Sequence, residues 1–409
     1  MQSCEYKNAV YRLKNGQPPG NAALIEEISA GVDFIADFWN EKYLEQYIKS
    51  GGSKIKFITG NEGSGKSHFL ELFTASAEKR GYITVSLSAK DTWVHDFKEI
   101  YTAILNKADI SVCLGKCAER IISELGYNAA AIPEGMRFAD YLSSIDSFDP
   151  ITKREIRLQL GKMFLQNPLI DNNFALCCSL LTGGILGHPL LEEPNRQLLL
   201  LWLAGGREAK LSAVRALGLS PSRITKYNAR HMLRSLVEVL KSAGYSGLIV
   251  GIDDLDVLIQ NSALEEIRYT KTRREDAYES IRELIDEIDT LKNLMFVFAF
   301  NRRLIDDDNR GLKSYQALWM RIQNEVEGER FNRFTDIVDM DRLAAQEYSA
   351  ETLMEMSRKI AKVLSEYGEG IAPISEEKAR ELLERSRFGQ ISLPRKISMA
   401  TAGMEAENG

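Results

Sequence analysis

The amino-acid sequence predicts an α/β protein with three layers, in which helices cover both faces of a parallel sheet. Residues 247–253 and 294–300 are apolar runs without alternation, which is typical of strands buried on both faces. A third apolar run, residues 54–59, is followed by glycines and then by residues at helical spacing. Because strands that alternate with helices form parallel sheets, the polar residues that follow these strands are expected to meet at one edge.

The chain is long enough for several structural units. With 409 residues it can form two or three units at about 100 to 200 residues each. The predicted order is a helical N-terminal segment (1–50), an α/β core in two parts (51–107 and 243–342), a helical insertion (108–242) between those parts, and a C-terminal helical lid (343–409).

Composition narrows the class of protein. The formal net charge of -6 argues against a basic protein that coats DNA, although a local basic face is compatible with it. The five cysteines are odd in number and irregularly spaced, and residues 1–24 lack the pattern of a secretory signal. We therefore expect a reducing, cytoplasmic setting and no metal site built from cysteines.

One uncharged stretch, residues 174–191, is nearly long enough to span a membrane. Glycines and a proline interrupt it at Gly183, Gly184, Gly187 and Pro189. We expect a buried helix pair joined by a glycine turn, and no membrane contact.

The remaining elements follow from local spacing. Helical spacing recurs at 9–13, 32–39, 67–79 and 93–107, and again from residue 343 onward, whereas residues 82–88 and 335–340 have the pattern of strands. Gly51 and Gly52 are expected to end the helix before the first strand.

The insertion shows no convincing strand, and short amphipathic segments are separated by prolines. Within it, residues 212–233 have the outline of a helix-turn-helix with Gly218 at the bend. A plain helix pair is the alternative to a DNA-reading element at this place.

The glycine-rich loop reads GNEGSGKS at residues 60–67 and predicts a phosphate-binding loop. Its glycines let successive N–H groups converge on one anion, and the following helix adds its positive end. Lys66 is placed to reach the β- and γ-phosphates, and the Ser67 hydroxyl to hold Mg²⁺. A chance glycine turn would lack the strand before it and the helix after it. The residues expected to bind the nucleotide here are Gly60, Asn61, Glu62, Gly63, Ser64, Gly65, Lys66, Ser67 and His68.

Acidic residues end the strand at 247–253. Asp253 is expected to hold Mg²⁺ together with Ser67, and Asp254 to polarise an attacking water. Asn301, after the next strand, could orient that water or contact the γ-phosphate. Because aspartate is shorter than glutamate, Asp254 leaves open a slow ATPase or a binding switch. Asp256 is expected only to cap a helix.

Arginines are candidates for catalysis between subunits. Arg321, Arg330 and Arg333 precede the last predicted strand, where an arginine could reach the nucleotide of a neighbouring subunit. Arg395 follows Pro394 in the C-terminal part and could fold onto the nucleotide when the lid closes.

The loop GNEGSGKS, the acids in LIVGIDDLD, the strand ending at Asn301 and the Pro394-Arg395 pair together resemble the AAA+ ATPases of the origin-recognition-like branch. The resemblance implies a P-loop NTPase core of AAA+ type that binds ATP with Mg²⁺ and assembles as a homo-oligomer. The choice of adenine over guanine comes from this resemblance alone.

A narrower resemblance covers most of the chain. The chain is similar to ATP-binding proteins of bacteriophage-exclusion (BREX) and related defence operons in AVYRLKNGQPP, WLAGG, RALGL, SAGYSGLIVGIDDLD, RREDAYESIRELID, LMFVFAF and YQALWMRI. This resemblance implies a cytoplasmic ATPase that works with a helicase-like or other defence protein, on DNA or in sensing infection. The family more often has Asp-Glu where this chain has Asp253-Asp254, which bears on the rate of hydrolysis.

Two alternatives to a remodelling ATPase remain open. One is a nucleotide-gated switch with negligible hydrolysis, and the other is an ATP-regulated DNA-binding protein that uses residues 212–233, with Arg223 and Lys226 as contacts. DNA could be bound directly or through the partner.

Overall fold

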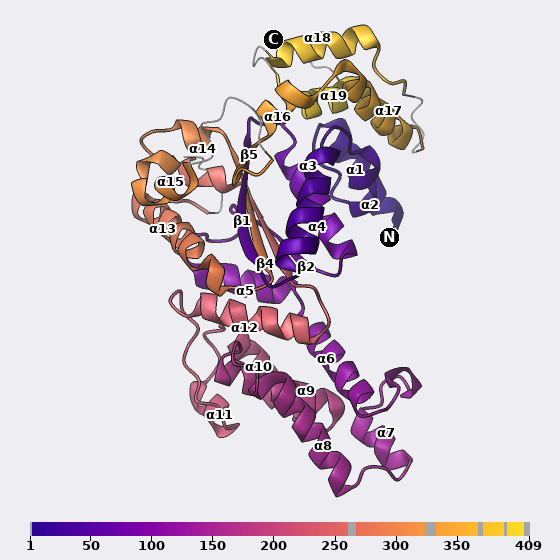
Figure 1. Cartoon of the computed structure of the whole chain (residues 1–409), viewed down its shortest axis with the longest axis vertical. Helices are drawn as coiled ribbons and strands as arrows, with labels where there is room; N and C mark the ends of the chain where they lie inside the picture. The colour runs from indigo at the N-terminus through magenta and orange to yellow at the C-terminus, as the bar shows by residue number, and fades with distance from the viewer. Residues whose placement is uncertain (1, 261–266, 324–332, 367–370, 388–390, 405–409) are drawn as a thin grey trace.

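The computed structural model describes residues 2–260, 267–323, 333–366, 371–387 and 391–404, with side chains from residue 7. A five-stranded, all-parallel sheet lies at its centre, in the order β2-β3-β4-β1-β5 (Figure 1). The strands are β1 (Ser53–Gly60), β2 (Ile83–Ser88), β3 (Leu248–Asp253), β4 (Leu294–Asn301) and β5 (Ile337–Asp339). All five predicted strands are confirmed, and β4 separates β1 from β3.

The sheet is buried on both faces, as the unbroken apolar runs predict. Phe57 on β1 belongs to the hydrophobic cluster on one face, whereas Ile58 belongs to the cluster on the other. On β3, Val250 and Ile249 divide between the faces in the same way. This alternation follows from the period of two along a strand and gives the three-layer arrangement.

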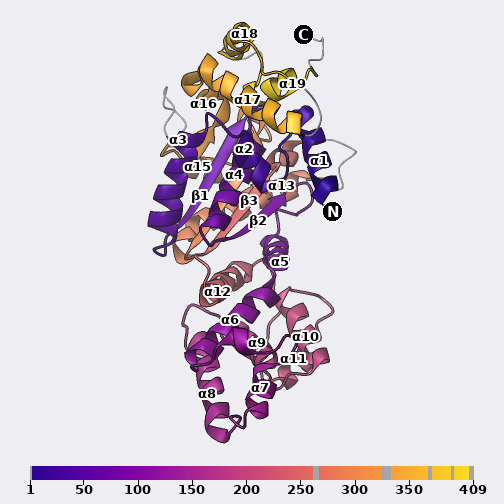
Figure 2. The same ribbon diagram turned by 90° about the vertical axis from the view of Figure 1, so that its right-hand side faces the viewer.

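The N-terminal helices cover one face of the sheet, and the lid lies beyond one end of the strands (Figures 1 and 2). Both share a hydrophobic cluster with that face of the sheet. The N-terminal elements are α1 (Gln2–Lys14), α2 (Ala22–Ile28), α3 (Asp33–Phe38) and the π-helical η1 (Trp39–Ile48), followed after β1 by α4 (Lys66–Lys79). The lid consists of α16 (Met340–Glu347), α17 (Ala350–Glu366), α18 (Glu376–Arg387) and α19 (Leu393–Thr401). The Ser398 hydroxyl on α19 donates to the Leu13 carbonyl on α1 at 2.5 Å, so the two ends of the chain meet.

The helical insertion extends from the opposite face and forms the lower lobe in Figures 1 and 2. Helix α5 (Phe97–Lys107), at the end of the first part of the core, leads into it. The insertion's own helices are α6 (Ile110–Glu124), α7 (Phe138–Ser144), α8 (Pro150–Leu160), α9 (Asn172–Leu186), α10 (Glu193–Leu203), α11 (Leu211–Ala216) and α12 (Ala229–Ser242), with the short η2 (Ala129–Ala131) and η3 (Gly161–Leu165). Residues 108–242 are all described and contain no strand. One hydrophobic cluster runs from the sheet into this lobe, so the insertion shares its core with the sheet.

The second part of the core follows β3. It contains η4 (Leu255–Ile259), α13 (Lys271–Glu287), η5 (Ile288–Thr290), α14 (Arg303–Asp306), η6 (Leu312–Ser314) and α15 (Gln316–Ile322). Helix α13 packs against α15 and lies beside the sheet in Figure 1.

Two predictions for the insertion are wrong. Residues 174–191 do not form a helix pair, because α9 continues through Gly183 and Gly184 and ends only at Leu186, before Gly187, which has φ +83°. Pro189 packs beside Gly183 instead of breaking the helix there.

The prediction of a helix-turn-helix at residues 212–233 is also wrong. Helix α11 ends at Ala216 and α12 begins at Ala229, whereas a helix-turn-helix needs a turn of three or four residues. In addition, α12 is largely buried, as Met232 and Leu233 illustrate, so it presents no recognition face.

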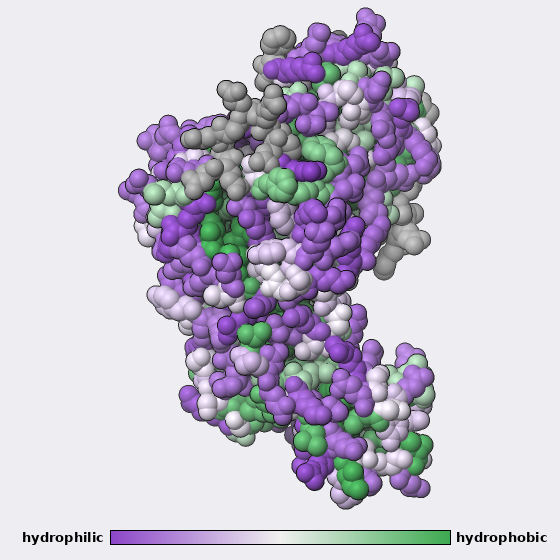
Figure 3. Space-filling model, in the orientation of Figure 1, coloured by the Kyte–Doolittle hydropathy of each residue, from purple (hydrophilic) through white to green (hydrophobic). Residues whose placement is uncertain are grey.

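The surface in Figure 3 is mostly hydrophilic, with hydrophobic residues in separate groups. Among the described helices, none is both long and apolar enough to cross a membrane. Four cysteines, Cys113, Cys117, Cys177 and Cys178, are buried as free thiols, and burial raises the pKa of Cys113 to about 11. These thiols are therefore protonated and unreactive at neutral pH.

Candidate functional site

A cavity of about 1330 Å³ lies between the carboxyl ends of the strands, the N-terminal segment and the lid. Residues from several separate parts of the chain line it, among them Lys66, Asp253, Asn301 and Arg395. The predicted meeting of the loop, the acids and Asn301 at one edge of the sheet is confirmed. The strand register explains it, because Gly60 is paired directly with Asn301 across β1 and β4.

The glycine-rich loop has the backbone that the motif requires. Positive φ angles occur at Gly60 (+154°), Gly63 (+83°) and Gly65 (+92°). Residues other than glycine rarely adopt such values. The loop also lies directly against the lid: a Cβ at Gly63 would come within 2.7 Å of Arg395 Cβ, and one at Gly65 within 3.3 Å of Pro394 Cγ. Gly65 is the N-cap of α4 and supplies no side-chain acceptor, so the first N–H groups of α4 remain available to an anion.

Lys66 is buried and folded back onto its own loop. Its Nζ donates to the carbonyl oxygens of Gly60 at 3.0 Å and Asn61 at 2.7 Å. Burial lowers the pKa of Lys66, and the negative charges of Asp253 and Asp256 oppose this change. A buried ammonium with only carbonyl partners is well suited to a phosphate, which would supply the full negative charge that these carbonyls lack.

Ser67 and Asp253 are joined across the sheet edge. The Ser67 hydroxyl donates to Asp253 Oδ2 at 2.5 Å. Burial raises the pKa of Asp253, the Ser67 hydrogen bond lowers it, and the neighbouring Asp254 raises it further. A divalent cation at this place would replace the hydroxyl proton as the partner of the carboxylate. Its positive charge would offset the free-energy cost of burying the ionised carboxylate.

Asp254 occupies a strained position with two partners. Its φ of +59° lies in the left-handed region, which is uncommon for residues other than glycine. Its carboxylate accepts from Lys90 Nζ at 2.7 Å and from the Ser88 hydroxyl at 2.8 Å. Asp254 therefore lines the cavity but is held by residues at the end of β2.

Asp256 has a different role from the one predicted. It caps no helix. Its Oδ1 accepts from the backbone N–H of Asn301 at 2.9 Å, and its Oδ2 accepts from Gln260 Nε2 at 2.6 Å. Asp256 thus fixes the end of β4 beside β3. The Asn301 side chain lines the cavity, and its Oδ1 accepts from the Arg303 N–H at 3.0 Å.

The predicted nucleotide-contacting residues at the lid and on α4 also lie at the cavity. Arg395 binds the loop twice: its guanidinium contacts Glu62 Oε1 at 2.5 Å, and its backbone N–H donates to the Gly63 carbonyl at 3.1 Å. His68 lines the cavity, but its Nε2 lies 2.7 Å from the Ser29 hydroxyl, and burial lowers its pKa to about 4. The His68 ring is therefore neutral.

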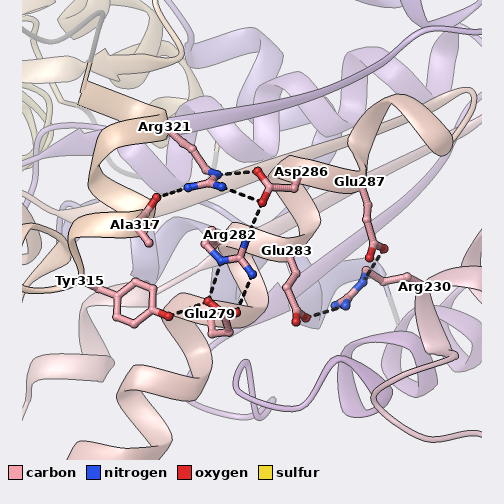
Figure 4. A network of polar contacts seen from close by, with 9 residues as sticks. All are labelled: Arg230, Glu279, Arg282, Glu283, Asp286, Glu287, Tyr315, Ala317 and Arg321. Atoms are coloured by element: carbon pink, nitrogen blue, oxygen red, sulfur yellow. Dashed lines mark hydrogen bonds and ion pairs between the residues drawn. The ribbon is translucent and has the colours of Figure 1, made fainter.

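The three arginines proposed to act between subunits are not at this cavity where they are described. Arg321 forms two hydrogen bonds with Asp286, at 2.5 and 2.9 Å, and a third with the Ala317 carbonyl (Figure 4). Arg333 is exposed, and its guanidinium lies 4.7 Å from the Phe38 ring centroid. Arg330 lies outside the described residues.

Sequence reasoning missed Asp341, Ser88 and Lys90. Asp341 Oδ2 accepts from the Asn61 N–H at 2.6 Å and so holds the start of the glycine-rich loop. Burial raises the pKa of Asp341, and this N–H bond opposes the change. All three residues lie at or just after the end of a strand, so the rule that drew attention to Asp253 would have found them at the ends of β2 and β5 as well.

The donor set fits a nucleotide with a magnesium ion. Among the described residues, no group of three or more His, Cys, Asp or Glu side chains could hold a metal by itself. Magnesium in nucleotide sites uses one or two protein ligands and completes its shell with phosphates and water, so Ser67 and Asp253 suffice. The loop with its positive-φ glycines supplies the matching cradle for the phosphates.

This combination of a parallel sheet, a glycine-rich loop before a helix, and a serine paired to a strand-end aspartate defines a P-loop nucleotide-binding protein. The chain belongs to the family described as "BREX system ATP-binding protein BrxC/D", whose model matches residues 10–397. It is therefore an ATP-binding protein of the BREX anti-phage defence system. No curated protein and no solved structure gives a significant match.

Proposed function

We propose that this protein is a Mg²⁺-dependent ATPase of AAA+ type that couples ATP binding and hydrolysis to remodelling or recruiting a DNA-processing partner in anti-phage defence. The observation that carries the proposal is the 2.5 Å hydrogen bond from Ser67 to Asp253, next to the buried Lys66. It joins the two groups that would share a magnesium ion, one from the loop and one from the acidic strand.

The residues divide the work according to their positions. Lys66 and the loop N–H groups would bind the β- and γ-phosphates, while Ser67 and Asp253 would hold Mg²⁺. Magnesium supplies charge neutralisation on the phosphates when it is bound. Asp254 would orient the attacking water once its contact with Lys90 is broken. Asn301 ends β4, which lies between β3 and β1, and would contact that water or the γ-phosphate.

The lid contacts the phosphate-binding loop and could therefore move when a nucleotide binds. Arg395 contacts Glu62 and Gly63 directly, and Pro394 packs against Gly65, so a phosphate bound in the loop would lie next to these contacts and would alter them. The same helix, α19, is hydrogen-bonded to α1 through Ser398. ATP binding would therefore shift the lid together with the N-terminal helix.

The proposal includes a homo-oligomer in which an arginine of one subunit completes the site of the next. Arg333 supports this assignment, because it is exposed and pairs with no carboxylate among the described residues. Arg321 would first have to leave Asp286. The partner would be a helicase-like or other defence protein, and DNA would be engaged directly or through it.

Two variants test the enzyme. Lys66→Ala should abolish ATP binding, because it removes the cation that reaches the phosphates. Asp254→Asn should bind ATP with the affinity of the parent but turn it over poorly. Calorimetry with Mg-ATP and steady-state phosphate release measure the two steps separately. An Asp254→Asn protein that hydrolyses ATP as fast as the parent would remove Asp254 from the mechanism.

A second candidate is a nucleotide-gated switch with negligible turnover. The contacts from Lys90 and Ser88 to Asp254 favour it, because they hold the short carboxylate at the end of β2. Phosphate release with and without DNA distinguishes the candidates. Turnover that stays at the Lys66→Ala background in both conditions supports the switch, and DNA-stimulated turnover supports the ATPase.

A further inference from the structure

A second cavity, of about 300 Å³, lies between the start of α5 and the segment of the insertion that joins α10 to α12. Four cationic residues line it: Lys98, Arg207, Arg223 and Lys226. Asp96 is the one acidic residue on its wall, and its carboxylate accepts from the Lys98 N–H at 2.9 Å as the N-cap of α5. The cavity therefore carries an excess of positive charge.

Most of the positive charge at this cavity has no opposite charge paired with it among the described residues. Within the part of the chain that the structure describes, none of the four cationic side chains forms an ion pair. Nearby Arg230, by contrast, is paired with Glu283 and Glu287. Residues 205–227 contain five Lys and Arg and one acidic residue, Glu208, in a chain whose net charge is -6. Such a concentration of unbalanced positive charge attracts an anionic ligand.

The cavity wall is held in a fixed conformation. The Trp202 indole donates to the Ser222 carbonyl at 3.0 Å, which ties the segment to α10. Asn228 closes the next turn, because its amide donates to the Arg223 carbonyl at 3.1 Å and its Oδ1 accepts from the Thr225 N–H at 2.7 Å. The cationic side chains thus project from an ordered backbone.

Arg223 also braces the facing wall. Its Nη1 donates to the Arg207 carbonyl at 3.1 Å and leaves its other guanidinium N–H groups for a ligand. Gly205, with φ +71°, allows Lys98 to come close: a Cβ there would lie 3.0 Å from Lys98 Cε. Close approach at this glycine brings the α5 lysine to the same cavity as the arginines.

An aromatic ring stands beside these charges. Tyr227 is 83% exposed, the largest exposed fraction among the large hydrophobic side chains that the structure describes, and Lys226 Nζ lies 5.4 Å from its ring centroid. An exposed ring next to a basic cavity is the combination that proteins use for single strands, whose phosphates bind the cations while a base stacks on the ring. A paired base inside a duplex offers no free face for stacking.

We propose that the cavity binds single-stranded DNA, with one backbone phosphate between Arg207, Arg223 and Lys226 and an adjacent base stacked on Tyr227. The site deepens the proposed function by giving the chain a direct DNA contact, and it rests on that function only for the choice of DNA. In this proposal the DNA is bound by the irregular segment between α10 and α12 and not by a helix-turn-helix.

Fluorescence anisotropy of a labelled oligothymidylate, titrated with the full-length protein in the absence of nucleotide, tests the site. The double variant Arg223→Gln/Lys226→Gln should bind at least about tenfold more weakly, and its plot of log affinity against log salt should be shallower by about 1.4. Tyr227→Ala should lose about tenfold, and Tyr227→Phe should restore binding. Arg215→Gln is the matched control, since Arg215 is exposed on α11 but does not line the cavity.

Other outcomes would overturn the proposal. These are parent-like binding by the double variant, an equal effect of Arg215→Gln, equal affinity for a blunt duplex that does not depend on Tyr227, and full displacement of the strand by inorganic phosphate at equimolar concentration. ATP binding and thermal unfolding, measured on each variant, should match the parent. The double variant should lose DNA binding and keep ATP binding, whereas Lys66→Ala should lose ATP binding and keep DNA binding. The two variants therefore test this DNA site and the proposed ATPase site independently.

Discussion

Ser67 on α4 and Asp253 at the end of β3 share a hydrogen bond of 2.5 Å, although β4 lies between β3 and the strand that leads into the loop. The bond shows that the serine hydroxyl and the carboxylate already face each other across the sheet edge. The conformational cost of bringing two ligands together is thus met by the fold, which favours tight binding of a cation between them.

Ser67→Ala should weaken the magnesium-dependent part of ATP binding by about tenfold or more, because one of two protein ligands is lost. Nucleotide binding in the presence of EDTA should be unchanged, since the loop N–H groups and Lys66 remain. Calorimetry with and without Mg²⁺ measures both quantities. Ser67→Thr keeps a hydroxyl and should retain most of the affinity. Equal losses in both buffers would mean that the hydroxyl supports the loop and not the cation.

Gly63→Ala should loosen the lid. The new Cβ would lie 2.7 Å from Arg395 Cβ and 2.9 Å from Arg395 Cδ, so α19 must shift away. Amide hydrogen exchange in α19 should become faster. Gly51→Ala is the control, because Gly51 also has a positive φ of +103° but open space around the added carbon. Both changes should lower stability by about 1–2 kcal/mol, and faster exchange in α19 after Gly51→Ala would contradict the steric argument.

His68 should make stability depend on pH. Its pKa is about 4 in the folded protein because of burial, against an ordinary value of 6.5 in the unfolded chain. Between these values the unfolded state binds more protons, so the free energy of unfolding falls as the pH is lowered from 6.5 to 4, by at most about 1.4 kcal/mol per pH unit. His68→Gln does not titrate and can still bond to the Ser29 hydroxyl.

Urea denaturation across this range, without nucleotide or divalent cations, measures the difference between the two proteins. The parent should lose stability faster than His68→Gln as the solution is acidified. Parallel curves for the parent and the variant would show that His68 has the same pKa in both states.

The sequence was sufficient where one local pattern decides the structure. The apolar runs before Asp253 and Asn301 are the buried strands that their pattern predicts, and the glycine spacing in residues 60–67 matches the loop that leads into α4. The meeting of these segments follows from the rule that parallel strands end at one edge. The architecture and the central residues of the site were therefore predictable.

The sequence-based predictions fail where the conformation or role of a residue depends on a contact with a residue far away in the sequence. Asp256 resembles a cap in sequence, but its carboxylate bonds to the N–H of Asn301 on another strand. Gly218 does mark a bend, yet Trp202 holds the segment after it as an extended loop, so no second helix begins there. Asp341 lies just after β5, but its role depends on the N–H of Asn61, which is 280 residues away in the sequence.

Arg230→Ala should destabilise the junction between the insertion and the core. Arg230 on α12 is 10% exposed, and its guanidinium bonds to Glu283 at 2.6 Å and Glu287 at 2.8 Å, both on α13 (Figure 4). The guanidinium also lies 5.3 Å from the Phe97 ring centroid on α5. Because the two carboxylates are partly exposed, water can replace the lost partner, and the cost should be about 1–3 kcal/mol, which is below that of a fully buried pair.

Chemical denaturation measures this cost, with Arg196→Ala as the control. Arg196 forms a single pair with Glu193 on its own helix and is 40% exposed, so its removal should cost no more than about 0.5 kcal/mol. Arg230→Lys should lie between the two, because an ammonium keeps the charge but cannot bond to both carboxylates in the geometry of the guanidinium. If Arg230→Ala were no less stable than Arg196→Ala, the insertion would be held to the core by the shared apolar cluster alone, and these ion pairs would contribute only to the orientation of α12.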